Sequence, residues 1–192
     1  FVGSRGLGDV YKRQDLINTH GIDCEIINHD KSEHKEKITA ENNQETFGNL
    51  SSLLKCFEIA KKDQSDLIYF VEDDYLHYEH SLVDMLNTYE RVSSQHKDEI
   101  IVCPSDYPFN YMNNEKTNIL IGSQQHWRTI TKMLCTFMIS KKMFQKHIDN
   151  FEKTCEKRHE PFEKYLNKIL ESEIGISPIK SLAVHMLSLI HI

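Results

Sequence analysis

Three consecutive carboxylates, Glu72-Asp73-Asp74, are the residues of this 192-residue chain best suited to do chemistry. They directly follow residues 67–71, an uninterrupted apolar run whose β-branched and aromatic side chains predict a strand covered on both faces. Adjacent negative charges repel each other unless a cation or hydrogen-bond donors compensate them. Because Mg²⁺ and Mn²⁺ prefer carboxylate oxygens, the triplet predicts a cation site. The alternative is an acidic strand end that only caps the next helix.

The elements around the triplet predict an α/β domain. Apolar side chains recur at helical spacing along one face of a predicted helix: Leu50, Leu53, Leu54, Phe57 and Ala60. Residues 82–89 repeat this pattern, and residues 24–28 and 100–103 are short apolar runs typical of strands. This βαβαβ alternation favours an open, mostly parallel, twisted sheet with right-handed crossovers. In such sheets ligands bind outside the carboxyl ends of the strands, which is where the triplet lies.

The second half of the chain has a mixed α+β pattern. Two strands and then two helices are predicted, over residues 117–122, 134–140, 140–152 and 160–171. The loop between the two strands carries Trp127. No linker divides the chain, which indicates a single domain with halves at residues 15–105 and 106–186.

The two ends of the chain resemble translated sequencing-adapter read-through rather than natural protein. The glycines of residues 3–8 have the wrong order for a dinucleotide-binding fingerprint, and no strand precedes them. We therefore expect residues 1–14 and 187–192 to be processing tails and residues 15–186 to be a single partial domain. The alternative is a natural loop at the start and a natural last strand.

Composition and charge exclude several classes of protein. The net charge of -6 argues against a nucleic-acid binder that relies on bulk electrostatics. The apolar runs are far shorter than the roughly 20 residues of a membrane-spanning helix, so no transmembrane span is expected. Five cysteines without a C-x-x-C pair fit neither a disulfide framework nor a zinc knuckle. A reducing, cytoplasmic compartment is the simplest interpretation.

The first half resembles nucleotide-sugar-dependent glycosyltransferases of the GT-A fold, family-2 type. The similarity lies in a helix opened by Phe47-Gly48-Asn49, a short turn, and the strand that ends in Glu72-Asp73-Asp74, where the family has its D-x-D motif. The resemblance implies a Rossmann-like sheet with residues 15–105 as the nucleotide-sugar half. Asp74 would then bind the Mn²⁺ or Mg²⁺ that bridges the donor diphosphate, with Glu72 and Asp73 beside the donor nucleotide. Glu72 departs from the family's first Asp.

The same resemblance extends to the residues before the helix. Residues 24–30 fall where the family has its second strand, which makes Asp30 a donor-site residue, although His29 replaces one acid of the family's pair. The family's first strand would lie before Asp15. We therefore expect the sequence to be truncated at its N-terminus and to lack part of the donor site.

Residues of the second half complete the expected site. Glu160, with Glu163 as the second choice, would be the base that takes the acceptor's proton in an inverting transfer; alternatively, both only favour the positive end of a helix. Arg128 would bind the diphosphate beside an aromatic platform, unless Trp127 is a core residue. His185 would be a late metal ligand or else a core histidine. His77 and His80 keep a zinc site open as an alternative.

These observations predict a cytoplasmic, metal-dependent glycosyltransferase. It would move a sugar from a nucleoside-diphosphate sugar to a glycan or a lipid-linked acceptor, with peripheral association at the inner face of the cell membrane and no nucleic-acid partner. A non-catalytic α/β binding module with an acidic cation or partner site is the alternative from another class. A metal-dependent nucleotidyltransferase or phosphotransferase is a third interpretation, because the same carboxylates suit any diphosphate chemistry.

Overall fold

The computed structural model describes residues 25, 27–39, 44–112, 114 and 116–186. The expected tails, residues 1–14 and 187–192, lie outside the described residues. The helices are η1 (Lys31–His34), α2 (Gln44–Lys62), α3 (Ser81–His96), α4 (Phe109–Met112), α5 (Lys141–Lys146), α6 (Ile148–Cys155) and α7 (Lys164–Ile169). The strands are β1 (Leu67–Phe70), β2 (Tyr75–His77), β3 (Ile100–Val102), β4 (Ile119–Ile121), β5 (His126–Ile130), β6 (Phe137–Ser140), β7 (Ile174–Pro178) and β8 (Ala183–His185).

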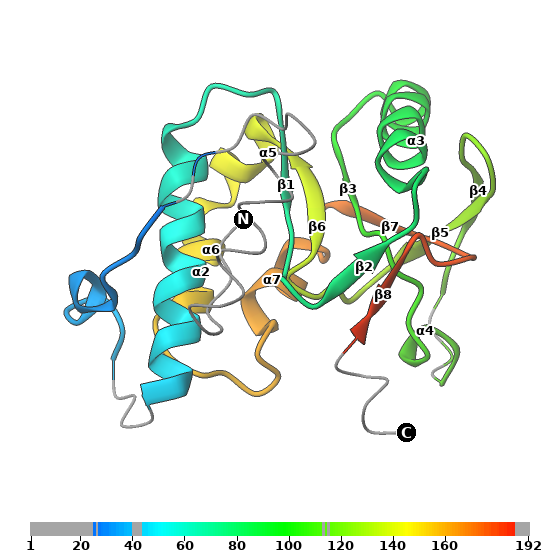
Figure 1. Ribbon diagram of the computed structural model, residues 1–192. Helices are drawn as coiled ribbons and strands as arrows, with labels where there is room; N and C mark the ends of the chain where they lie inside the picture. Colours follow the sequence, from blue (N-terminus) through cyan, green and yellow to red (C-terminus); the bar gives the residue numbers. More distant parts are fainter. Residues whose placement is uncertain (1–24, 26, 40–43, 113, 115, 187–192) are drawn as a thin grey trace.

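The described strands form a six-stranded sheet in the order β1-β6-β3-β7-β5-β4 and a separate pair, β2-β8. The α/β class is confirmed, but the prediction of a mostly parallel sheet is wrong. Only β3 and β7 pair in parallel, and the other pairs in the large sheet are antiparallel. The reason is the position of β6, which lies between β1 and β3 and runs antiparallel to both. The crossover through α3 therefore joins two strands of the same direction that are not neighbours (Figure 1).

Several predicted elements have different limits in the structure. The first amphipathic helix begins at Gln44, well before its predicted apolar face, and Ser51 lies buried inside it. The expected loop around Trp127 is strand β5, because a tight turn in which the Gly122 N–H donates to the Gln125 carbonyl joins it to β4. A break at His147 divides the predicted 140–152 helix into α5 and α6. The described part of the predicted strand at 24–28 has no strand conformation.

Two layers of helices cover the sheet and enclose two apolar cores. In Figure 1, α2, α5, α6 and α7 lie on one face and α3 lies on the other. The first core is rich in aromatic rings: Phe57, Phe70, Phe137, Phe144 and Phe151. The second core lies under α3 and contains Met85, Val102, Trp127 and Ile176. Because β1 and β6 are held against the first core, the residues that follow β1 have a fixed starting point.

The small β2-β8 pair brings the end of the acidic triplet beside the last described strand. Tyr75 lies opposite His185, Leu76 opposite Val184 and His77 opposite Ala183. The pair is attached to the large sheet where the Leu182 N–H donates to the Pro104 carbonyl at 2.8 Å. Among the described residues, no helix has the length and apolar character that crossing a membrane requires.

Candidate functional site

Asp74 and His185 meet at the junction of the two sheets, although 111 residues separate them in sequence. The Asp74 carboxylate oxygen Oδ2 lies 2.9 Å from His185 Nε2, and the Met186 N–H donates to the Asp74 carbonyl at 2.8 Å. The Tyr75 ring stacks on the imidazole, with centroids 4.8 Å apart and planes 13° apart. The other carboxylate oxygen, Asp74 Oδ1, is buried and has no hydrogen-bond partner.

The spacing of this pair is compatible with two neighbouring ligands of one small divalent ion. Metal–oxygen distances near 2.1 Å at a right angle place adjacent ligand atoms roughly 3 Å apart, and the pair is 2.9 Å apart. The unpartnered Asp74 Oδ1 adds a second carboxylate oxygen. The described residues contain no group of three or more His, Cys, Asp or Glu side chains that could hold a metal. Any ion here would take most of its remaining ligands from water and phosphate.

Glu72 is held next to this pair by Thr136, which precedes β6. The Glu72 N–H donates to Thr136 Oγ1 at 3.0 Å, and the Thr136 hydroxyl lies 3.3 Å from Glu72 Oε2, as a donor to it. Burial of the carboxyl, followed by the negative charges of Asp74 and Glu163, raises the pKa of Glu72 to about 7. The carboxyl is therefore partly protonated at neutral pH. Asp73, the middle residue of the triplet, is half-buried.

The two predicted bases differ in where the structure places them. Glu163 immediately precedes α7, is half-buried, and lies close enough to Glu72 for its charge to raise the pKa of that carboxyl. The pKa of Glu163 itself is raised, mainly by burial and also by Glu160. Glu160 is exposed. The predicted helix 160–171 begins only at Lys164, so the sequence placed the helix start too early. Glu163 is thus the better positioned of the two predicted bases.

Arg128 has partners of its own. Its guanidinium lies over the Tyr111 ring at 4.0 Å, its Nε is 4.0 Å from Asp106 Oδ1, and its Nη1 donates to the Asn110 carbonyl at 3.4 Å. The positive charge of Arg128 is therefore offset by Asp106. The neighbouring Trp127 is fully buried, so its ring cannot be a sugar platform.

Asp30 is separated from the other predicted site residues. It is exposed and accepts a hydrogen bond from the Ser32 N–H at 2.9 Å, which caps η1 and lowers the pKa of its carboxyl. Helix η1 lies on the far side of α2 from β2 and β8 (Figure 1). In this structure Asp30 is a capping residue.

The two histidines of the zinc alternative, His77 and His80, have different surroundings in the structure. His77 Nε2 lies 2.5 Å from the Tyr69 hydroxyl, and burial lowers the pKa of the imidazole. His80 is exposed at the start of α3. Neither belongs to a group of three metal-binding side chains within the described residues.

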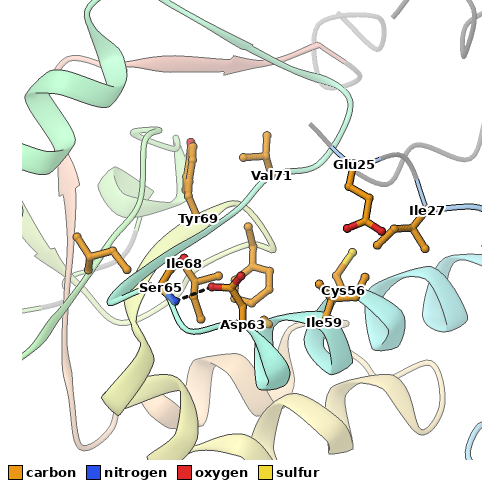
Figure 2. A pocket seen from close by; sticks show the side chains of 12 residues that line it. Glu25, Ile27, Cys56, Ile59, Asp63, Ser65, Ile68, Tyr69 and Val71 are labelled. Carbon is orange, nitrogen blue, oxygen red and sulfur yellow. Dashed lines mark hydrogen bonds between the residues drawn. The ribbon is translucent and has the colours of Figure 1, made fainter. Parts of the chain in front are cut away.

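A pocket of about 470 Å³ lies beside β1 and the second half of α2. Figure 2 shows its lining from Cys56 and Ile59 of α2, Ile68 and Tyr69 of β1, and Glu25 before η1. The pocket reaches Val71, the residue directly before Glu72. Glu72, Asp74, Glu163 and His185, termed here the carboxylate cluster, are not among its lining residues, and Val71 links the pocket to the cluster in sequence.

Sequence comparison does not assign this site to a family. No protein-family model matches the chain, and no curated protein matches it either. The functional argument therefore depends on the geometry of Glu72, Asp74, Glu163 and His185. Thr136 was missed by sequence analysis, because a lone threonine 64 residues from Glu72 carries no local signal.

Proposed function

We propose that the chain is a glycosyltransferase that binds a nucleoside-diphosphate sugar through a divalent ion held by Asp74 and His185. One observation carries the proposal: the partly buried Asp74 carboxylate, directly before β2, has one buried oxygen without a hydrogen-bond partner and the other 2.9 Å from an imidazole nitrogen. A bound Mn²⁺ or Mg²⁺ would neutralise charge on the leaving diphosphate. Water and the donor phosphates would supply the ligands that the protein does not.

The carboxylates around this pair have distinct parts in the proposal. Glu72 and Asp73 contact the donor beside the ion, and the partly protonated Glu72 donates a hydrogen bond as well as accepting one. Glu163 takes the proton of the acceptor hydroxyl as the new sugar–oxygen bond forms and the bond to the diphosphate breaks. Its raised pKa makes Glu163 a stronger base than an ordinary glutamate. Attack from the side opposite the diphosphate inverts the anomeric carbon.

The acceptor in this proposal is a glycan or a lipid-linked acceptor, and the reaction takes place in the cytoplasm or at the inner face of the cell membrane. The pocket beside β1 adjoins Glu72 through Val71, so it can receive the part of the donor that lies beyond the diphosphate.

Isothermal titration calorimetry tests the donor site. The chain is titrated with Mn²⁺ alone and then with UDP, GDP, ADP and CDP in the presence of Mn²⁺. We expect one nucleotide to bind in a Mn²⁺-dependent way and Asp74→Asn to weaken this binding by at least about 100-fold, because even residues that only support a ligand are worth about 10- to 100-fold. Glu79→Gln is the matched control, since Glu79 is an exposed acid close by in the sequence.

The outcomes separate the rival functions. Unchanged nucleotide binding by Asp74→Asn contradicts the proposal. Cation binding without binding of any nucleotide supports the non-catalytic module instead. Release of sugar 1-phosphate or pyrophosphate from the bound donor identifies a phosphotransferase or nucleotidyltransferase.

A further inference from the structure

Residues 106–112, termed here the aromatic loop, present ring faces next to the Asp74–His185 pair. The Tyr107 hydroxyl is hydrogen-bonded to the Tyr75 hydroxyl, and the Tyr75 ring stacks on His185. One ring therefore separates the loop from the proposed metal ligands. In Figure 1 the loop's short helix, α4, lies at the same end of the molecule as β8.

The loop displays aromatic surface that the apolar cores do not use. The rings of Tyr107 and Phe109 stack in parallel, with centroids 5.2 Å apart and planes 10° apart. Tyr111 is 59% exposed and Met112 is 78% exposed, while Phe109 is half-buried. Large apolar side chains that are gathered and exposed in this way commonly mark a binding site.

The aromatic loop is held in place by polar contacts. The Asp106 N–H donates to Ser181 Oγ at 2.8 Å, and the Ser105 hydroxyl donates to the Ala183 carbonyl at 2.7 Å. The Asp106 carboxylate accepts hydrogen bonds from the Tyr111 hydroxyl and the Asn110 amide. Because these contacts fix the rings before any ligand arrives, binding to them loses little conformational freedom.

The charges around the loop limit what it can bind. Glu72 lies close enough to Tyr107 for its negative charge to act on that residue, and Asp106 lies 4.0 Å from Arg128 and offsets its positive charge. An anionic ligand would be repelled. A pyranose ring has an apolar C–H face that can cover an aromatic ring and a rim of hydroxyls that suits carboxylate, amide and phenol groups.

We propose that the aromatic loop is the acceptor subsite and that it takes a neutral pyranose unit of a glycan. The proposal rests on the proposed transferase function. A sugar stacked on Phe109 would be held beside Tyr107 and would direct the next sugar's hydroxyl toward the carboxylate cluster. The subsite recognises the carbohydrate itself, not a lipid chain or a phosphate.

Saturation-transfer-difference NMR tests the subsite without donor or metal. The probes are two neutral tetrasaccharides, cellotetraose and chitotetraose, with tetragalacturonate and phosphatidylglycerol vesicles as anionic and lipid probes. We expect a neutral tetrasaccharide to bind and Phe109→Ala to weaken it by at least about tenfold, the scale of one aromatic contact. Phe109→Tyr keeps the ring and Tyr78→Ala removes a 51% exposed ring outside the loop, so both should remain within about twofold of the original chain.

Three results would overturn the subsite. They are no binding of either neutral tetrasaccharide, equal binding by Phe109→Ala, and tighter binding of tetragalacturonate or the vesicles. Thermal unfolding of each variant shows whether it has folded, and Phe109→Leu, which keeps an apolar side chain but removes the ring, takes the place of Phe109→Ala if that variant has not. Sugar binding without nucleotide binding would support the subsite proposal and contradict the transferase proposal. Nucleotide binding without sugar binding would support the transferase proposal and contradict the subsite proposal.

Discussion

Two polar clusters of this molecule use the same types of side chain and differ in their charge balance. The carboxylate cluster combines Glu72, Asp74, Glu163 and His185. The α2 cluster combines His29, His34, Ser51 and Glu58, where the segment before α2 packs against that helix. Each contains histidine and glutamate in a partly or fully buried setting.

The α2 cluster compensates its charges internally. The fully buried Ser51 hydroxyl lies 2.7 Å from His29 Nε2 and 2.8 Å from His34 Nδ1. His34 Nε2 lies 3.2 Å from Glu58, which also pairs with Lys37. Although burial raises the pKa of Glu58, the hydrogen bonds from Lys37 and His34 outweigh burial, and its pKa is lowered.

The carboxylate cluster lacks this compensation. Each cluster contains one buried polar atom without a hydrogen-bond partner, His29 Nδ1 in the α2 cluster and Asp74 Oδ1 here, so the two differ in their charges. Burial and the neighbouring acids Asp74 and Glu163 raise the pKa of Glu72, whereas the pKa of Glu58 is lowered. Acidic groups whose pKa is raised by burial and by neighbouring acids are candidates for functional sites, where a ligand can balance the charge. This contrast supports the proposal in which the carboxylate cluster is the functional site and the α2 cluster is structural.

The largest predicted effect follows from the pKa of Glu72. Because the folded-state pKa is raised from 4.5 to about 7, the stability that protonated Glu72 contributes is present below pH 4.5 and is lost as the pH rises through 7. At pH 8, Glu72→Gln should raise the free energy of unfolding by about 2–3 kcal/mol, since each pKa unit corresponds to about 1.4 kcal/mol. At pH 4 the difference should disappear. Urea unfolding of the original chain and of Glu72→Gln at pH 8 and pH 4 measures this difference in the free energy of unfolding.

Glu58→Gln is the matched control for this experiment. Its expected change in the free energy of unfolding at pH 8 has the opposite sign. Because the pKa of Glu58 is lowered, its stabilising contribution is present above its unfolded-state pKa and is lost as the pH falls. Glu58→Gln should therefore destabilise the chain at pH 8. If both substitutions change stability in the same direction at pH 8, the contrast between the clusters is wrong.

A smaller effect is expected from Ser51→Ala in the α2 cluster. The substitution leaves two buried imidazole nitrogens without their shared hydroxyl and should lower the free energy of unfolding by about 2 kcal/mol. The neighbouring Ser52→Ala should change it by less than about 0.5 kcal/mol. Urea unfolding at pH 7 measures both, and Mn²⁺ binding should be the same in each. A loss of Mn²⁺ binding in Ser51→Ala would make the α2 cluster part of the functional site.

Local sequence patterns predicted the parts of this fold that depend on neighbours in the chain. The apolar face from Leu50 to Ala60 and a strand before Glu72 are confirmed, because their periodicity and composition are sufficient. The expectation that this strand is covered on both faces is wrong, since β1 lies at the edge of the described sheet and only Phe70 of its four residues is buried. The position of β6 between β1 and β3 was not predictable in this way, since it depends on strand pairing across more than sixty residues to β1 and 36 residues to β3. The prediction of a mostly parallel sheet was wrong for this reason.

The same distinction between local sequence patterns and long-range contacts applies to the candidate site. The triplet and its position after an apolar strand were evident from local sequence, whereas Asp74 and His185 were expected in one site only from the resemblance to glycosyltransferases. The α2 cluster was missed because residues 29–46 are polar and have no clear periodicity. Its histidines become buried only when η1 packs on α2.

Paramagnetic broadening by Mn²⁺ tests the central claim most directly, because it locates the ion among the histidines. Substoichiometric Mn²⁺ is added to the ¹⁵N-labelled chain at pH 7.5, and the imidazole resonances are followed, with His185→Gln used to assign the signal. The account predicts that the His185 resonance broadens first, while those of His29 and His34 persist. First broadening at His29 or His34, or equal broadening at all histidines, would contradict it.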